Sequence, residues 1–379
     1  MLVLVSGCHS SQNTAQRDAG PEVQGETHDR SAPDGGLDVL PNTAPSGTFV
    51  VTGSMHRQRL WHTATLLPSG KVLVVGGVGW DSGELAALAS TELYDPATGV
   101  FTYTGSLATA RYLQTATLLP DGRVLIVGGW DSENYFASAE LYDATSGTFV
   151  ATGSMSAPRA GHSATLLPTG KVLIAGGCDT TTSDLASAEL YDPASGLFAA
   201  TGDLSERRQM HTATLLSNGL VLIAGGNNSY DVSTADLYDP TSGRFTATGN
   251  MLVPIDGYTA TLLPSGNVLI AGGGDRNGFV LGAELYDAAR GEFVPTGQLA
   301  QPRGTPATVL LPSGKVLIAG GQGTSPDIPT AELYDPIAGT FTLTNPMTEA
   351  RTAATATLLP NGSVLLAGGY GLASAELFY

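Results

Sequence analysis

The chain has 379 residues, more than the ~250–300 at which a single compact core usually stops growing, so several domains or a modular ring are expected. Glycine occurs 49 times and charged residues make up only 13% of the chain, a composition typical of many short strands and tight turns. The formal net charge of −17 argues against nucleic acid and anionic lipid as partners, because an acidic surface repels both.

Residues 1–8 resemble the end of a bacterial lipoprotein signal. The four residues that end at Cys8 read Val-Ser-Gly-Cys, which matches the motif of one aliphatic residue, two small residues and a lipidated cysteine. The segment has no basic n-region and its apolar run is shorter than the usual ~7–15 residues, so we interpret it as a truncated signal. The alternative is an ordinary apolar N-terminus that ends in Ser-Gly-Cys by chance.

The resemblance implies a lipid anchor at Cys8, through which alone the chain would contact a membrane. The next residue is His9 rather than aspartate, which by enterobacterial sorting favours the outer membrane or cell surface. Residues 9–46 are rich in Ser, Gln, Asp, Gly, Pro and Thr and have few apolar side chains, so we predict a disordered tether. A folded domain that is held at the bacterial cell envelope, or secreted, is therefore expected to follow.

From residue 47 to residue 379 the sequence repeats one unit. Each unit contains a Gly-Gly pair, and successive pairs are about 50 residues apart. A run that is apolar throughout precedes each pair, which indicates a strand covered on both faces. In the first unit, four strands named a to d are expected at 63–67, 72–75, 91–94 and 101–104. The Gly-Gly pairs lie at 76–77, 128–129, 176–177, 225–226, 272–273, 320–321 and 368–369.

These pairs, with a recurrent tyrosine in strand c and a phenylalanine in strand d, resemble the Kelch repeat over about residues 47–379. Kelch families usually have tryptophan in strand d, and a smaller ring at that position still fills the core between blades. The resemblance implies an all-β fold, a seven-bladed β-propeller of four-stranded antiparallel blades. The recurrent aromatic residues are Tyr94, Tyr142, Tyr191, Tyr238, Tyr286, Tyr334 and Phe378 in strand c, and Phe49, Phe101, Phe149, Phe198, Phe245, Phe293 and Phe341 in strand d.

The ends of the repeat predict how the ring closes. The first element, at about 48–55, is a strand d without strands a to c before it. The last unit has strands a to c, which end at Tyr379, and no strand d after them. Pairing of the two completes a seventh blade and covers an edge that would otherwise be bare.

Strand order also predicts which face could bind a ligand. The a–b and c–d turns are short and nearly identical, so their face is expected to be structural. The b–c and d–a loops share the opposite face and carry most of the variation, as binding loops on a rigid scaffold do.

Two sets of repeated polar residues occur on this variable face. An arginine recurs in the d–a loops and could hold a carboxylate or phosphate of a ligand. Because this arginine belongs to the repeat, we favour pairing of each arginine with a nearby loop carbonyl or loop acid instead. Three histidines share one position at the start of strand a and invite a zinc hypothesis, but we favour hydrogen-bonded histidines and expect no metal. The sets are Arg59, Arg111, Arg159, Arg208, Arg303 and Arg351, with Ile255 in the fifth unit, and His62, His162 and His211.

Aromatic residues gather in the loops of units one and two, where acids and amides alternate with them. Flat rings beside hydrogen-bonding groups suit carbohydrate or a protein hot spot, whereas loop residues that pack on one another are the alternative. The candidate ligand-binding residues are Arg59, Trp61, Trp80, Asp81, Arg111, Tyr112, Trp130, Asp131, Asn134 and Tyr135.

We therefore expect a non-catalytic, monomeric binding module for a glycan or protein, without a cofactor and without a catalytic residue. Kelch-type enzymes offer an alternative, either copper oxidases resembling galactose oxidase or mutarotases of sialic acid. The oxidase family needs an adjacent Tyr-His pair and a Tyr–Cys cross-link; the pair is absent, and Cys178 has no recognisable partner set. A third possibility is a structural scaffold that docks a partner subunit.

Overall fold

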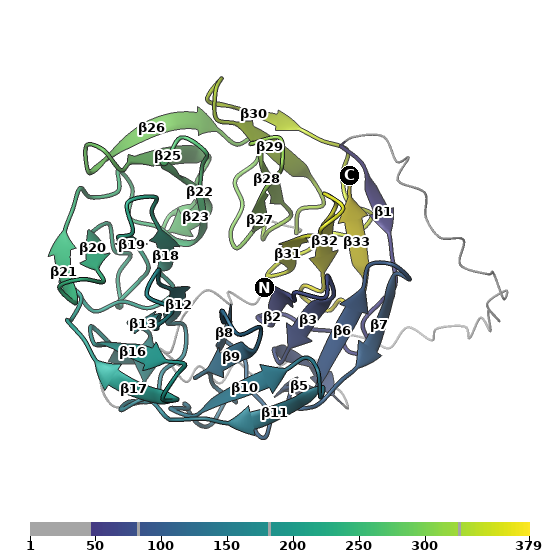
Figure 1. Cartoon of the computed structure of the whole chain (residues 1–379). Helices are drawn as coiled ribbons and strands as arrows, with labels where there is room; N and C mark the ends of the chain where they lie inside the picture. Colours follow the sequence, from purple (N-terminus) through teal and green to yellow (C-terminus); the bar gives the residue numbers. More distant parts are fainter. Residues whose placement is uncertain (1–46, 82–83, 181–182, 325–326) are drawn as a thin grey trace, which may run out of the picture.

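The computed structural model describes residues 47–81, 84–180, 183–324 and 327–379. Seven antiparallel sheets stand around a central axis as the blades of a propeller (Figure 1). Each blade has four strands in the order a-b-c-d, and the fifth blade has one short additional strand. The prediction of an all-β, seven-bladed propeller is therefore confirmed. The described residues contain no helix able to cross a membrane.

Strands a lie nearest the axis, and each contacts strand a of the blades on either side, so the ring is continuous. They are β2 (Thr63–Leu66), β8 (Thr115–Leu118), β12 (Ser163–Leu166), β18 (Thr212–Leu215), β22 (Asp256–Leu262), β27 (Ala307–Leu310) and β31 (Thr355–Leu358). Strands b are β3 (Val72–Val75), β9 (Val124–Val127), β13 (Val172–Ala175), β19 (Val221–Ala224), β23 (Val268–Asp275), β28 (Val316–Ala319) and β32 (Val364–Ala367).

Strands c and d form the outer half of each blade. Strands c are β6 (Thr91–Asp95), β10 (Ala139–Asp143), β16 (Ala188–Asp192), β20 (Ala235–Asp239), β25 (Gly282–Asp287), β29 (Ala331–Asp335) and β33 (Ala375–Phe378). Strands d are β7 (Val100–Tyr103), β11 (Thr148–Ala151), β17 (Leu197–Ala200), β21 (Arg244–Ala247), β26 (Glu292–Gln298), β30 (Thr340–Leu343) and β1 (Phe49–Val51). The predicted strands agree with these bounds to within one residue in the first blade.

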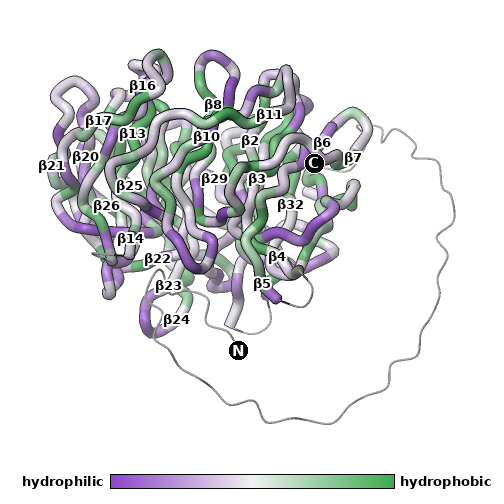
Figure 2. Tube along the Cα trace, turned by 90° about the horizontal axis from the view of Figure 1, so that it is seen from below, coloured by the Kyte–Doolittle hydropathy of each residue, from purple (hydrophilic) through white to green (hydrophobic). Residues whose placement is uncertain are grey.

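The b–c loops contain secondary structure that the sequence did not predict. Three of them form hairpin strands where we expected irregular loops. These strands are β4 (Val78–Asp81) with β5 (Glu84–Ala87), β14 (Cys178–Asp179) with β15 (Ser183–Asp184), and β24 (Gly278–Phe279) on an extended β23. In Figure 2, β4, β5, β23 and β24 project from one and the same face of the ring.

The ring closes as predicted, by pairing of its first and last described strands. β1 is antiparallel to β33, with Phe49 opposite Phe378 and Val51 opposite Glu376. The two phenylalanine rings lie 4.9 Å apart between centroids. Beyond the strand, the amide of Met55 donates to the carbonyl oxygen of Ala373 at 2.8 Å. Residues near the two ends of the chain thus complete one blade.

Packing between blades provides the core. Strand b is fully buried in every blade, as its apolar run predicts. One cluster joins Val75 of the first blade to Ile126 and Tyr142 of the second, and the other clusters join neighbouring blades in the same way. A single blade would expose these side chains, so each blade depends on its neighbours.

A threonine–tyrosine hydrogen bond recurs at six of the seven blade junctions. The threonine follows strand d of one blade, and its hydroxyl lies 2.8–2.9 Å from the strand-c tyrosine of the next. At the junction between blades six and seven these positions hold Thr344 and Phe378, and the hydroxyl of Thr344 donates instead to the carbonyl oxygens of Ala331 and Asn345. This junction lacks the hydroxyl that the other six share.

Restoring that hydroxyl should stabilise the propeller. We expect Phe378→Tyr to raise the free energy of unfolding by about 0.5–1.5 kcal/mol, the usual net worth of one hydrogen bond. Tyr334→Phe, which removes the equivalent bond to Thr296, should lower it by a similar amount. Urea unfolding of both variants checks this, and a destabilised Phe378→Tyr protein would show that blade seven has no room for the hydroxyl.

Candidate functional site

The variable face, named here the loop face, carries the d–a loops (52–62 in the first blade) and the b–c loops (76–90). The opposite, short-turn face carries the a–b turns (67–71) and the c–d turns (95–100). All candidate residues from the sequence belong to the loop face. The structure divides them into buried arginine supports and a group of aromatic and polar residues, in which Tyr112 is buried and the other described members are partly or fully exposed.

The repeated arginines are buried supports. Arg59 is fully buried, and its Nη1 donates to the carbonyl oxygens of Gly76 at 2.9 Å and Ser90 at 2.8 Å. Its Nη2 donates to Oε1 of Glu92 at 2.9 Å. We call this arrangement the arginine clasp, because it fastens each d–a loop to strands b and c of the following blade.

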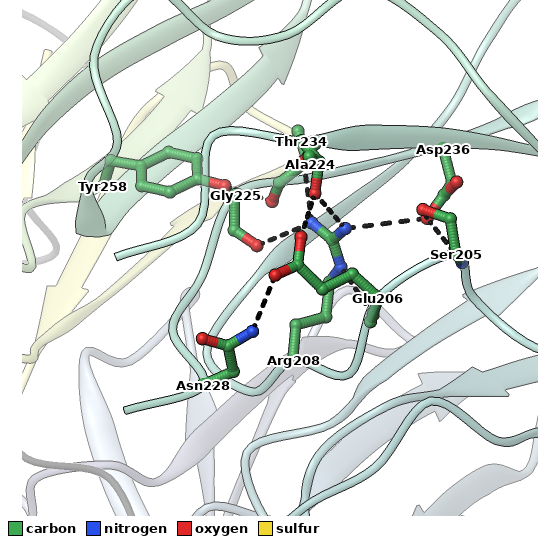
Figure 3. A network of polar contacts seen from close by, with 9 residues as sticks. All are labelled: Ser205, Glu206, Arg208, Ala224, Gly225, Asn228, Thr234, Asp236 and Tyr258. Carbon is green, nitrogen blue, oxygen red and sulfur yellow. Dashed lines mark hydrogen bonds and ion pairs between the residues drawn. The ribbon is translucent and has the colours of Figure 1, made fainter. Parts of the chain in front are cut away.

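The clasp recurs in six blades. Figure 3 shows it around Arg208, whose guanidinium donates to the carbonyl oxygens of Gly225 and Thr234 and lies 3.6 Å from Asp236. Burial lowers the pKa of Arg59, while the hydrogen bond with Glu92 opposes that effect. The acids are Glu92, Glu140, Glu189, Asp236, Glu332 and Glu376, at N–O distances between 2.7 and 3.6 Å.

The clasp occupies the guanidinium groups of Arg59 and Arg111 and so limits their role in ligand binding. Their side chains are 0% and 1% exposed, and their donors face the protein rather than the mouth of the ring. Local pairing therefore describes these arginines, although the partners are strand-c acids and glycine carbonyls and not the loop acids. We assign both residues to the support of the loop face.

The fifth blade has no clasp. Ile255 replaces the arginine and packs in the core, and burial raises the pKa of the strand-c acid Glu284, which accepts the amides of Leu252 and Val253. Burial also raises the pKa of the adjacent Asp256 to about 6, against a hydrogen bond from the side chain of Asn227.

The three repeated histidines are uncharged side chains that lie between the inner strands, strands a, of neighbouring blades. Nε2 of His62, His162 and His211 lies 2.9–3.1 Å from a hydroxyl of the preceding blade's strand a. Burial lowers the pKa of each to about 3, and the nearby clasp arginine lowers it further. Within the described residues, no three His, Cys, Asp or Glu side chains are grouped as metal ligands.

These histidines should make the fold sensitive to acid. A neutral, buried histidine takes up a proton only on unfolding, so its contribution is complete above pH about 6.5 and falls as pH drops toward 3. We expect His162→Gln, which copies Gln114 of the second blade, to reduce this loss by up to ~1.4 kcal/mol per pH unit. Urea unfolding of both proteins at matched pH values measures the difference, and equal acid sensitivity would contradict it.

The residue before each histidine position adopts left-handed backbone in all seven blades, with φ between 46° and 61°. Five of these residues are not glycine, and such strain is retained only where the surrounding structure enforces it. In several blades the amide at this position donates to the carbonyl oxygen of its counterpart one blade earlier, as Met210 does to Gly161 at 2.8 Å. We call them the axial ring: Trp61, Leu113, Gly161, Met210, Gly257, Thr305 and Ala353.

The aromatic residues of blades one and two form a continuous row. The ring centroids of Trp61 and Tyr112 are 5.8 Å apart, those of Tyr112 and Trp130 are 5.3 Å apart, and those of Trp130 and Tyr135 are 5.4 Å apart. We name these four residues the aromatic arc. The prediction that they form a binding site remains a prediction, but the structure places them side by side.

Trp80 is an exposed aromatic residue on the hairpin next to the arc. It lies on β4, is 43% exposed and pairs across the hairpin with Leu85, which is also exposed. The base of the hairpin contacts the arc, because Val78 packs with Tyr112 and Trp61. The side chain of Asp81, another candidate, lies outside the described residues.

Polar candidates border the arc in the second blade. Oδ1 of Asp131 accepts the amides of Glu133 at 2.9 Å and Asn134 at 2.7 Å, which fixes the turn. Burial raises the pKa of Asp131, but these hydrogen bonds outweigh it and hold the pKa below its usual value. Burial raises the pKa of Tyr135 to about 12. At neutral pH the border therefore combines a carboxylate with a phenol that keeps its proton.

Sequence reasoning missed a second aromatic position on the loop face. Tyr230 is 67% exposed, and the Arg276 guanidinium carbon lies 5.6 Å from the centroid of its ring. The amide of Arg276 donates to Oδ2 of Asp231 at 3.3 Å. These residues lie in neighbouring b–c loops of blades four and five, and only the ring geometry brings them together.

Comparisons with known proteins agree with this architecture. A family model described as the Kelch motif matches residues 112–156. The chain is similar to the solved structure of a fungal alcohol oxidase of the AA5 family, in complex with copper, at 20% identity and a TM-score of 0.71. The similarity covers 89% of this chain and 76% of the oxidase, and at this identity it concerns the fold. No curated protein matches the sequence. The chain thus carries a Kelch motif within a seven-bladed β-propeller.

Proposed function

We propose that the protein is a non-catalytic binding module that recognises a glycan or a protein through its loop face. The observation that carries this proposal is the aromatic arc together with the exposed indole of Trp80, which stands on the hairpin whose base contacts the arc. Tryptophan and tyrosine dominate binding hot spots because they offer a large area with few rotamers. The clasp arginines and the histidines are engaged in the fold, which leaves the arc and its polar border for a ligand.

The proposal includes a location. A lipid on Cys8 would hold the propeller at the outer membrane or cell surface, and residues 9–46 would set its distance from the membrane. Both segments lie outside the described residues. Mass spectrometry of the mature N-terminus tests the anchor, and an unmodified or uncleaved Cys8 would point instead to secretion without a lipid.

A glycan array and a pull-down from envelope extract, each with wild type and Trp80→Ala, test the binding function. We expect Trp80→Ala to weaken binding by roughly tenfold or more, as loss of a hot-spot tryptophan does. Because Trp80 is exposed, the free energy of unfolding should change by no more than about 0.5 kcal/mol. Leu197→Ala, an exposed substitution on the outer strand β17, is the matched control. Equal binding by all three proteins would remove the arc from consideration.

The side chains that could bind copper bear on the oxidase alternative. The copper-oxidase ligand set requires histidines and tyrosines that converge on one point. His62, His162 and His211 instead contact hydroxyls of three different blade junctions. Cys178 is buried on β14, and no group of three His, Cys, Asp or Glu ligands occurs in the part of the chain that is described. The residues present do not fit that centre.

A further inference from the structure

The charges of the propeller are distributed unevenly between its two faces. All lysines of the chain, Lys71, Lys171 and Lys315, lie on the short-turn face, where each pairs with an aspartate at 3.0–3.2 Å. Arg123 on that face also pairs with Asp121, at 2.6 Å. The six clasp arginines are buried and neutralised by strand-c acids. Little positive charge therefore remains for the loop face.

Acidic side chains predominate on the loop face. Outside the clasps, the basic side chains of the described loops are Arg57, Arg207 and Arg276, together with His56. The acids outnumber them: Glu84 lies on the hairpin of Trp80, opposite Asp81, and Glu133 lies in the turn fixed by Asp131 beside the arc. The described loop-face acids are Glu84, Asp131, Glu133, Asp179, Asp184, Asp203, Glu206, Asp231, Asp256, Asp275, Asp327 and Glu349, of which Asp179 and Asp184 are buried.

The rings of the aromatic arc cover one another. Trp130 and Tyr135 are nearly parallel, with an interplanar angle of 10°, and Trp61 and Tyr112 have an angle of 17°. A sugar ring needs a free, flat aromatic face, and within the arc each ring already has a neighbouring ring on at least one side. Trp80 is the exception because its side chain is 43% exposed. One exposed indole, on a face where carboxylates outnumber cationic side chains, suits a cation better than an extended glycan.

The loop face already holds a cation of its own in this way. The guanidinium of Arg276 lies over the ring of Tyr230, and Asp231 accepts the amide of the same arginine. Closer to the arc, the guanidinium of Arg111 lies 4.9 Å from the ring centroid of Phe136. A guanidinium over an aromatic ring is thus an arrangement that this face already uses.

From this complementarity we propose that the partner is a protein segment rich in lysine and arginine, which lies across the aromatic arc with one cationic side chain on Trp80. This inference rests on the proposed function and names its ligand class. Acids at the border attract the segment over a distance of about 10 Å at moderate salt, and the exposed indole selects a cationic side chain at close range. The short-turn face, where lysines pair with aspartates, lacks both features.

Fluorescence anisotropy with a labelled Lys/Arg-rich peptide tests the inference, with a neutral Gly/Ser peptide of equal length and neutral oligosaccharides as comparison probes. We expect Glu84→Lys and Glu133→Lys each to weaken binding of the basic peptide by roughly fivefold or more at low salt. Glu292→Lys changes the net charge equally but lies on the outer strand β26, near the short-turn face, so it should weaken binding by less than about twofold. Trp80→Phe should retain most of the affinity that Trp80→Ala loses.

The outcomes separate the inference from the binding function. Oligosaccharide binding that Trp80→Ala abolishes, without binding of the basic peptide, would overturn the cationic partner and retain the binding module. An equal effect of Glu292→Lys would also overturn the inference, because it would show attraction by net charge alone. Absence of binding by every probe, and of a partner in the pull-down, would count against the binding module itself.

Discussion

A chain that begins at Gly53 is expected to lose cooperative folding and to aggregate, whereas a chain that begins at Ser46 should melt like the intact protein. The shorter chain lacks β1, and therefore the partner of β33 and the ring of Phe49 that packs with Phe378. It also lacks Thr52, whose hydroxyl lies 2.9 Å from that of Tyr94 in the first blade. Loss of a fully buried aromatic side chain costs about 3–5 kcal/mol, and loss of the partly buried Phe49 should cost part of that, a noticeable share of the stability of a typical domain.

Urea unfolding and static light scattering of the two truncated chains measure this effect. Phe49→Ala in the intact chain provides an intermediate case, because it keeps the backbone hydrogen bonds of β1 and removes only the ring. We expect aggregation only when β1 is absent, since β33 then has an unpaired edge. If the chain from Gly53 is monomeric and as stable as the chain from Ser46, the closure contributes nothing and the ring is held by its inner strands alone.

The second large effect is expected from Arg303→Ala. Arg303 donates to Oε1 of Glu332 at 2.7 Å and to the carbonyl oxygens of Gly320 and Thr330 at 2.8 Å, and both charged side chains are buried. Removal of one partner leaves an uncompensated buried charge, which costs about 3–5 kcal/mol. The expected change in the free energy of unfolding is therefore several times that of an exposed salt bridge, such as Lys315 with Asp335.

The fifth blade provides the control for this experiment. Ile255 stands there in place of arginine, and its acid Glu284 has a raised pKa. We expect Arg303→Ile to raise the pKa of Glu332 likewise, so the variant should recover stability as pH falls and that carboxyl takes up a proton. Addition of Glu332→Gln should recover part of the loss at neutral pH. A loss below about 1 kcal/mol for Arg303→Ala would contradict a structural role for the clasp.

The repeats explain how much of the fold can be predicted from the sequence. The seven Gly-Gly pairs, the apolar strand b and the unpaired first strand specify the number of blades and the closure, and the structure confirms both. Local pairing of the arginines was also favoured because they belong to the repeat. Their true partners were not predictable, since Arg59 and Glu92 meet only after strands b and c have formed.

The site is less predictable than the fold because it depends on contacts between blades. The gathering of tryptophans predicted a cluster, and the structure aligns Trp61, Tyr112, Trp130 and Tyr135 in one row. The stacking that covers their faces could not be predicted, nor could the contact of Tyr230 with Arg276 across two loops. Such contacts depend on hairpin geometry, whereas the repeat pattern reports only on the scaffold.

The axial ring gives this protein an unusual capacity for redesign. Each blade presents one side chain at an equivalent backbone conformation, from glycine at 161 and 257 to the indole of Trp61. Natural variation has already placed five different non-glycine residues there without altering the strands that follow. A combinatorial library at these seven positions could therefore vary the side chains of the axial ring one blade at a time, while the scaffold stays the same.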